Sequence, residues 1–366
     1  MSSIETKNID VKDIKYQKYL PKDFKSPNPI RWCPGCGDYA VLTCLQKALA
    51  ELNVEPCNTA VISGIGCSSR LPYYMNTYGF HSIHGRANAI ATGVKVANPG
   101  LSVWVATGDG DSLAIGGNHF IHTIRRNVDL NILLFNNKIY GLTKGQYSPT
   151  SARGFVSKSS PYGTVEEPFR PAELTFGARG TFFGRALDVD MKNQVDTLIE
   201  AAKHKGTSVV EILQNCVIFN DGIHDKITDR TWKADNTVVL KHGEKMIFGK
   251  EENKGIVLDG WNLKVVTIGE DGYTMDDVLV HDCTTQDNTL HLKLALMDTA
   301  DGLPVALGVI RSVDAPTYES DYEKQIAEVQ EKMPKKSFTD FLLSQPNIWE
   351  VKLLFTSPLF YDGFHF

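Results

Sequence analysis

The sequence predicts an α/β protein whose core is a doubly wound, mostly parallel sheet with a carboxy-terminal extension. Between residue 38 and about residue 220, apolar extended runs alternate with segments of helical periodicity. The extended runs are continuously apolar, which is typical of strands that helices cover on both faces. A chain of 366 residues with 42% hydrophobic and 22% charged residues is also long enough to bury a large core.

Each element follows from its periodicity and from the residues at its ends. Residues 38–52 have apolar positions at helical spacing, and Asp38 suits the N-cap. The run 59–65 is β-branched and predicts the first strand. The same criteria predict helices over 85–98, 112–126 and 194–204 and strands over 102–107, 131–136 and 207–213. Residues 141–185 are rich in Gly, Ser, Pro and Thr and predict a long loop, which is usually functional.

Composition divides the chain into three parts. Residues 1–29 are polar, carry six lysines and end in the prolines of SPNPI, which predicts an amino-terminal arm. Residues 30–235 form the predicted α/β domain, and residues 236–366 form a carboxy-terminal lobe and extension. Beyond about residue 316 the periodicity is helical, which predicts a surface helix or an element that binds a partner.

Charge and targeting signals limit the function. The 38 basic and 43 acidic residues give a net charge of −5, which argues against binding to nucleic acid or to an anionic membrane. The amino terminus lacks the apolar core of a signal peptide, and no apolar run approaches the roughly 20 residues that span a bilayer. We therefore expect a cytoplasmic protein. Its seven cysteines, an odd number, predict reduced thiols rather than a disulfide framework.

Three predicted strands end in unusual loops, at residues 63–70, 107–112 and 136–146. Ligands of open parallel sheets bind beyond the carboxyl ends of the strands, so these loops meet if the strands are neighbours. The glycines of TGDGDS allow close approach to a ligand, and the helix that follows suits a diphosphate. Asp109 can hold Mg²⁺ with the Asn137 side chain and the Ile139 carbonyl. A Gly-Asp-Gly turn alone is a weak signal, because an Asx turn explains it equally well.

The stretch RWCPGCGDYA gives Cys33 and Cys36 a spacing that fits a redox dithiol, a zinc site or an iron–sulfur cluster. A thioredoxin-like motif has Gly and Pro in the opposite order and follows a strand, which disfavours the dithiol. Zinc needs a second close pair of ligands, which the remaining cysteines do not supply. Cys67 and Cys216 follow predicted strands at the same edge of the sheet, so four thiolates there are a reasonable cage for a [4Fe–4S] cluster.

The GDG and NN motifs together resemble the signature of thiamine diphosphate enzymes. The wider text SGIGCSSR, HSIHGRANAIATG, GDGDSLAIGGNHFIHTIRRN and IYGLTKGQYSPTS resembles the β subunit of 2-oxoacid:ferredoxin oxidoreductases over residues 28–225, and residues 240–315 resemble the carboxy-terminal part of that subunit. The 2-oxoglutarate type is the most similar. The resemblance implies a thiamine diphosphate-binding fold of the transketolase-like, diphosphate-domain type.

The resemblance also implies the residues of the site. The Mg²⁺ ligands are Asp109, Asn137 and the carbonyl of Ile139. The residues around thiamine diphosphate are Ile65, Gly66, Cys67, Ser68, His84, Gly110, Asp111, Gly141 and Leu142. The ligands of the [4Fe–4S] cluster are Cys33, Cys36, Cys67 and Cys216.

The implied reaction is the coenzyme A-dependent oxidative decarboxylation of a 2-oxoacid, with electrons passed through the cluster to ferredoxin. The conversion of 2-oxoglutarate to succinyl-CoA is the first choice, and pyruvate or a broad range of 2-oxoacids is the alternative. Catalytic roles are assigned to Arg70, His84 and Lys144. Arg70 would bind a substrate carboxylate, with Lys144 as second candidate and His84 as a donor to phosphate. Each of the two cations is equally well explained as a solvated or phosphate-facing charge.

The chain holds only the diphosphate-binding half of such a site. In similar proteins another subunit provides the glutamate that activates the aminopyrimidine, so we expect activity only with an α subunit, which would also carry much of the coenzyme A site. Two other classes compete with this interpretation. A thiamine enzyme without redox function would have no use for the four cysteines, and a zinc-stabilised interaction subunit would leave the GDG and NN loops unexplained.

Overall fold

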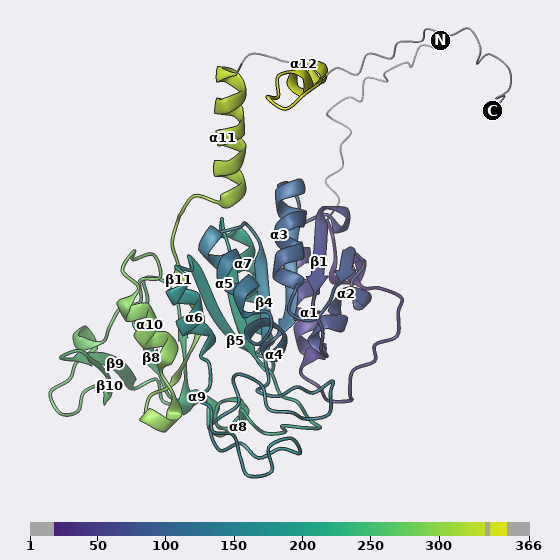
Figure 1. Cartoon of the computed structure of the whole chain (residues 1–366). Coiled ribbons are helices and arrows are strands. Elements are labelled where there is room, and N and C mark those ends of the chain that lie inside the picture. The colour runs from purple at the N-terminus through teal and green to yellow at the C-terminus, as the bar shows by residue number, and fades with distance from the viewer. Residues whose placement is uncertain (1–17, 334–336, 350–366) are drawn as a thin grey trace, which may run out of the picture. The chain divides into compact units, whose positions relative to one another are not determined.

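The computed structural model describes residues 18–333 and 337–349 of the chain. Eight strands form the main sheet: β1 (Thr59–Ser63), β2 (Tyr78–His81), β3 (Ser102–Gly108), β4 (Asn131–Asn136), β5 (Phe182–Leu187), β6 (Ser208–Leu213), β7 (Thr237–Leu240) and β11 (Val305–Ser312). Their order is β2-β1-β3-β4-β6-β5-β11-β7 (Figure 1). The strands from β2 to β5 in this order are parallel, whereas β11 is antiparallel to β5 and pairs in parallel with β7. The predicted mostly parallel sheet is therefore confirmed.

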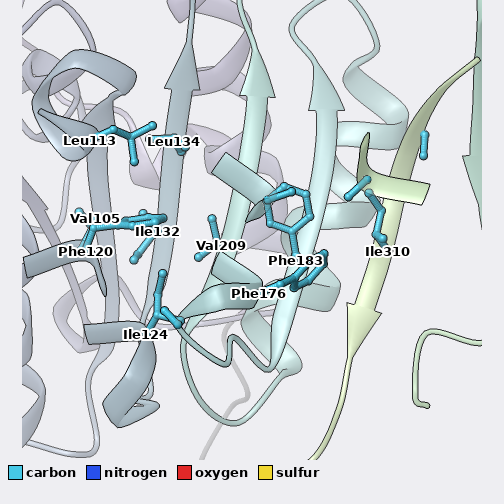
Figure 2. Close-up of a cluster of buried hydrophobic side chains, with 14 of the residues drawn as sticks. Val105, Leu113, Phe120, Ile124, Ile132, Leu134, Phe176, Phe183, Val209 and Ile310 are labelled. Carbon is cyan, nitrogen blue, oxygen red and sulfur yellow. The ribbon is translucent and has the colours of Figure 1, made fainter. Parts of the chain in front are cut away.

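Helices cover both faces of this sheet. Neighbouring residues of each strand point to opposite faces, so the apolar strands present apolar side chains on both. Trp104 belongs to a buried cluster with α1 and α7, whereas Val105 belongs to a second cluster with α3, α5, α6 and α10. Figure 2 shows this second cluster, in which Val105 lies near Phe120 of α5. The helices are α1 (Asp38–Glu51), α3 (Ala87–Ala97), α5 (Gly117–Arg126), α6 (Pro171–Gly177), α7 (Met191–Lys203) and α10 (Thr289–Leu296). The sheet is thus doubly wound.

Two segments differ from the sequence-based expectation. The predicted helix 112–126 is two helices, α4 (Asp109–Leu113) and α5, since the chain turns between them at Gly116. A Cβ atom at Gly116 would lie 2.4 Å from the carbonyl oxygen of Asp111, so only glycine fits this turn. The predicted loop 141–185 ends earlier, because it contains α6 and the start of β5.

Smaller elements complete the described chain. A second sheet contains β8 (Ile247–Phe248), β9 (Lys254–Asp259) and β10 (Asn262–Thr267) in antiparallel order. The short helices are α2 (Leu71–Tyr74), α8 (Asp225–Thr228) and α9 (Lys233–Asn236). Because β7 and β11 belong to the main sheet, the segment after residue 236 contributes to the same core. The boundary after residue 235 stays a prediction.

The chain divides into a unit up to Ser320 and a small unit from Asp321. The helical periodicity beyond residue 316 corresponds to α11 (Tyr318–Lys332) and α12 (Phe338–Leu343). Of the predicted arm 1–29, residues 1–17 lie outside the described residues, and Phe24 in the remainder is fully buried. Among the helices of the described ranges, none has both the length and the apolar character needed to cross a bilayer.

Candidate functional site

The loops after β1, β3 and β4 lie side by side because these strands are neighbours in the sheet. They surround a cavity of about 530 Å³, a size typical of small-molecule sites. This cavity, here called the cofactor cavity, is lined by all residues that the sequence assigned to thiamine diphosphate or Mg²⁺: Ile65, Gly66, Cys67, Ser68, His84, Asp109, Gly110, Asp111, Asn137, Ile139, Gly141 and Leu142. Their contacts with a bound cofactor stay a prediction.

Asp111 holds the first two loops of the cavity together. Its Oδ1 accepts hydrogen bonds from the backbone amides of Ile65 at 3.0 Å and Gly85 at 2.8 Å, and it lies 2.7 Å from Nδ1 of His84. Its Oδ2 accepts a hydrogen bond from the Thr107 hydroxyl at 2.8 Å. These partners account for both oxygens of a side chain that is almost fully buried. Asp111 therefore positions the first loop and the His84 ring.

Asp109 is buried without a cationic partner. Its Oδ2 accepts hydrogen bonds from the hydroxyls of Ser148 and Thr150, each at 2.6 Å. Burial raises the pKa of this carboxyl, and the two hydroxyls oppose the rise. Within residues 18–333 and 337–349, no Lys, Arg or His side chain forms an ion pair with Asp109. A divalent cation would supply the missing positive charge, so Asp109 fits a Mg²⁺ ligand.

The third loop brings further oxygen atoms to the same place. Nδ2 of Asn137 donates to Oε1 of Gln214 at 2.8 Å, and Oδ1 of Asn137 accepts from the backbone amide of Ile139 at 3.2 Å. The Tyr140 hydroxyl donates to the carbonyl of Gly110 at 2.8 Å and joins this loop to the second one. Carboxylate, amide and carbonyl oxygens are the ligands that Mg²⁺ prefers. The donor set therefore fits the predicted metal.

Two cysteine sulfurs lie beside Gly141, which is part of the wall of the cofactor cavity. A Cβ atom at Gly141 would lie 3.5 Å from Sγ of Cys216 and 3.6 Å from Sγ of Cys67. The missing side chain of Gly141 thus leaves room for both thiols beside the third loop. Cys36 lies nearby, because Nε2 of Gln214 donates to its Sγ at 3.3 Å. Gln214 therefore contacts both a predicted Mg²⁺ ligand and a predicted cluster ligand.

Two of the predicted cluster ligands, Cys36 and Cys67, have pKa values that burial and neighbouring charges raise. Burial, followed by the charges of Asp38, Cys216 and Cys33, raises the pKa of the Cys67 thiol to about 12. Burial and Asp38 also raise the pKa of Cys36, with smaller contributions from Cys67 and Cys216. Thiols of such high pKa stay protonated at neutral pH unless a metal centre binds the thiolate. The site fits a metal centre better than a reactive dithiol.

A ready-made zinc site would bring its ligands close together, because tetrahedral zinc requires sulfur atoms about 3.8 Å apart. In the part of the chain that the structure describes, no three Cys, His, Asp or Glu side chains lie close enough to hold one metal ion. An iron–sulfur cluster separates its thiolates by the width of the cluster and does not need this close approach. The described side chains therefore do not form a ready-made zinc site.

The three predicted catalytic residues lie at different positions. His84 lines the cavity with 39% of its side chain exposed, and the contact of Nδ1 with Asp111 leaves Nε2 for a ligand. Arg70 is half-buried, does not line the cavity, and lies close enough to Cys67 that its charge lowers the pKa of that thiol. Lys144 is exposed, with a left-handed φ of 76°, and does not line the cavity. Their catalytic roles stay predictions.

Sequence reasoning missed the polar residues that support the predicted ligands. Ser148 and Thr150 lie in the segment SPTS. The sequence shows that this segment is rich in hydroxyls, but it does not show that they bind Asp109. Gln214 follows directly on the predicted strand 207–213 and therefore lies at the ligand-binding edge of the sheet. A search of every strand end for polar residues would have included Gln214.

The fold and the cavity define the diphosphate-binding half of a thiamine diphosphate enzyme. Residues 64–212 match the family model described as the thiamine pyrophosphate enzyme, C-terminal TPP binding domain. This range contains the three cavity loops. Cys33 and Cys36 lie before it, and Cys216 lies after it.

Comparison with known proteins gives the family. The chain is 46% identical over 329 residues to the 2-oxoglutarate oxidoreductase subunit KorB of Mycobacterium tuberculosis, which covers 90% of this chain and 87% of that protein. It is 42% identical over 252 residues to the 2-oxoglutarate synthase subunit KorB of Methanothermobacter marburgensis, which covers 68% of this chain and 87% of that protein. The chain belongs to the family of β subunits of 2-oxoacid:ferredoxin oxidoreductases.

A solved structure agrees with this assignment. The 2-oxoglutarate:ferredoxin oxidoreductase from Magnetococcus marinus, with 2-oxoglutarate, coenzyme A and succinyl-CoA bound, matches with a TM-score of 0.71 and 32% identity. The match covers 90% of this chain and 97% of that chain. Enzymes of this family use thiamine diphosphate, Mg²⁺ and a [4Fe–4S] cluster. As a β subunit, the chain is part of an oxidoreductase that also contains an α subunit.

Proposed function

We propose that this chain, together with its α subunit, oxidatively decarboxylates 2-oxoglutarate to succinyl-CoA and passes the electrons to ferredoxin. The names of the two KorB relatives and the ligands of the Magnetococcus marinus structure support 2-oxoglutarate over the alternative, pyruvate or a broad range of 2-oxoacids. A cytoplasmic location stays the prediction of the sequence. The observation that carries the redox part of the proposal is the position of the Cys67 and Cys216 sulfurs beside Gly141, on the wall of the cofactor cavity.

The residues of the cavity have distinct proposed roles. Asp109, Asn137 and the Ile139 carbonyl would hold Mg²⁺, and the metal would bind the diphosphate. Thiamine diphosphate supplies the carbanion chemistry of decarboxylation when it is bound. His84 lines the cavity and Asp111 holds its Nδ1, so its Nε2 stays available and would contact a phosphate oxygen.

The electron path is short in this arrangement. Cys67 both lines the cofactor cavity and is a proposed cluster ligand, so the cluster would lie next to the cofactor. A zinc ion in the same place could not accept electrons, because zinc has no redox chemistry. The proposal therefore requires iron and sulfide in the protein.

The first test is the metal content of the anaerobically purified protein. We expect about four iron and four acid-labile sulfide per chain, as in a [4Fe–4S] cluster, and little zinc. Cys67→Ala should lose both iron and sulfide, whereas Cys57→Ala should keep them, because Cys57 is exposed and belongs to no proposed site. Stoichiometric zinc without sulfide would refute the redox part of the proposal and favour a zinc-stabilised subunit.

The substrate is tested with the α and β subunits expressed together. Arg70 is proposed to bind the distal carboxylate of 2-oxoglutarate, because a guanidinium binds a carboxylate through two parallel hydrogen bonds. Loss of such a contact costs about 1.5–3 kcal/mol, which is about 10- to 100-fold in kcat/KM. We expect Arg70→Ala to show this loss with 2-oxoglutarate and a much smaller loss with pyruvate. An equal loss with both substrates would exclude the distal-carboxylate role, and Lys144→Ala tests the second candidate in the same assay.

A further inference from the structure

A second cavity lies behind the loop that carries the proposed metal ligands. It has a volume of about 490 Å³ and is separate from the cofactor cavity. Asn137 and Ile139 line the cofactor cavity, whereas Asn136 and Lys138 line the second one. Successive residues of this segment therefore line opposite cavities, and Lys138 within it has a left-handed φ of 55°. The two cavities therefore share residues 136–139 as a common wall.

Cationic side chains gather in this rear cavity. Lys138, Arg170 and Lys226 line it, and none of the three forms an ion pair within the described residues of the chain. The acidic residues Asp225 and Asp298 also line it; both are exposed, as are Arg170 and Lys226, whereas Lys138 is half-buried. The rear cavity therefore has more positive than negative charge available for a ligand.

Lys138 and His224 both belong to the wall of the rear cavity. Burial, followed by the charge of Lys138, lowers the pKa of His224 to about 4. His224 is a buried residue of the cavity wall, so the Lys138 ammonium lies near it. By contrast, the charge of Arg185 is paired within the protein, because its guanidinium donates to Oε2 of Glu211 at 2.8 Å and also to the carbonyl of Ala295 at 2.9 Å.

Apolar side chains form another part of the wall of the rear cavity. Phe169 is half-exposed at the cavity, and Met297 is buried in its wall. A cavity lined by both cationic and apolar side chains suits a ligand with a charged group and a carbon skeleton. We propose that the rear cavity binds a small organic anion, whose phosphate or carboxylate group contacts Lys138, Arg170 and Lys226. Nothing in the proposed reaction uses this cavity.

Pyridoxal 5′-phosphate is a suitable probe, because its phosphate seeks an anion site and its aldehyde forms an imine with a neighbouring lysine that borohydride fixes. The experiment uses the complex of α and β subunits saturated with thiamine diphosphate and Mg²⁺, so that the cofactor cavity is occupied. Peptide mapping then gives the labelling rate of each lysine. We expect Lys138 or Lys226 to be labelled about tenfold faster than Lys250, an exposed lysine outside the cavity.

Competition and substitution complete the test. Inorganic phosphate and malonate are added in separate arms, and the stronger competitor shows whether the site prefers phosphate or carboxylate. Arg170→Gln should reduce the preferential labelling about tenfold, whereas Arg230→Gln, an exposed control outside the cavity, should leave it unchanged. Equal labelling of the three lysines, no protection by either anion, or no effect of Arg170→Gln would each overturn the proposal. The readout is independent of catalytic activity, so it does not depend on the proposed reaction.

Discussion

Replacement of Thr150 by valine tests how the fold prepares the metal site. The substitution keeps the shape of the side chain and removes the hydroxyl, whose oxygen lies 2.6 Å from Oδ2 of Asp109 and 2.9 Å from Oδ1 of Asn136 and whose one proton these two acceptors share. A hydrogen bond to a buried carboxylate contributes about 1.5–3 kcal/mol. Its loss raises the pKa of Asp109 further and removes one constraint on the orientation of the carboxylate. We therefore expect the Kd for Mg²⁺ to rise about 10- to 100-fold.

The assay titrates Mg²⁺ into the metal-free complex of α and β subunits at a fixed concentration of thiamine diphosphate. Tryptophan fluorescence can follow binding, because the Trp32 indole donates to the carbonyl of Cys67 at 2.7 Å, at the edge of the cofactor cavity. Thr150→Ser keeps the hydroxyl and should therefore keep the affinity for Mg²⁺. Ser159→Ala is a matched control, because this serine of the same segment is exposed and its hydroxyl forms a hydrogen bond with the hydroxyl of Ser157, away from Asp109. If Thr150→Val binds Mg²⁺ as tightly as Thr150→Ser does, the hydroxyl does not support the metal site.

Two further predictions concern stability. Gly110→Ala should lower the free energy of unfolding by about 1–3 kcal/mol, because a Cβ atom there would lie 2.3 Å from the Tyr140 ring. Gly93→Ala should raise it by about 0.5–1 kcal/mol, because Gly93 lies within α3 and a Cβ atom there would have no neighbouring atom of the described chain within 4 Å. Denaturant unfolding measures both, and equal effects would contradict the steric argument. Burial lowers the pKa of His204 from 6.5 to about 4, so the unfolded chain binds a proton that the folded chain excludes. The contribution of His204 to the free energy of unfolding is therefore fully present above the unfolded pKa. It is lost as the pH drops towards 4, by about 2 kcal/mol between pH 7.5 and pH 5. His204→Gln should lose this part of the pH dependence, and an unchanged pH dependence would refute the assignment.

The sequence predicted the cavity because its signals are local. Asp109 and Asn137 each follow directly on an apolar strand, and the adjacency of those strands was enough to bring their loops together. Ser148 and Thr150 were not predicted, because they lie 39 and 41 residues from Asp109 and reach it only through the tertiary path of the third loop. Hydroxyl-rich segments are common in loops, so composition alone does not identify the partner.

Strand β5 was missed for a related reason. Its sequence FFGRAL contains Gly184 and Arg185, which interrupt the apolar pattern of a buried strand. Arg185 is nevertheless buried, since it lies opposite Glu211 in the register of β5 and β6 and pairs with it at 2.8 Å. A charged residue in a central strand becomes tolerable only when its partner on the neighbouring strand is known. A single strand does not contain that information.

Two buried carboxylates in one hydrogen-bond network differ in how the fold compensates their charge. Glu211 and Asp109 are both 2% exposed, and both are linked to Asn136, Glu211 directly and Asp109 through Thr150. Burial alone would raise the pKa of Glu211, but the Arg185 charge and the Asn136 amide lower it overall. Asp109 has only neutral donors, and its pKa is raised. The fold thus provides a cation for Glu211, whereas Asp109 receives neutral donors within the described residues, which agrees with the Mg²⁺ site proposed there.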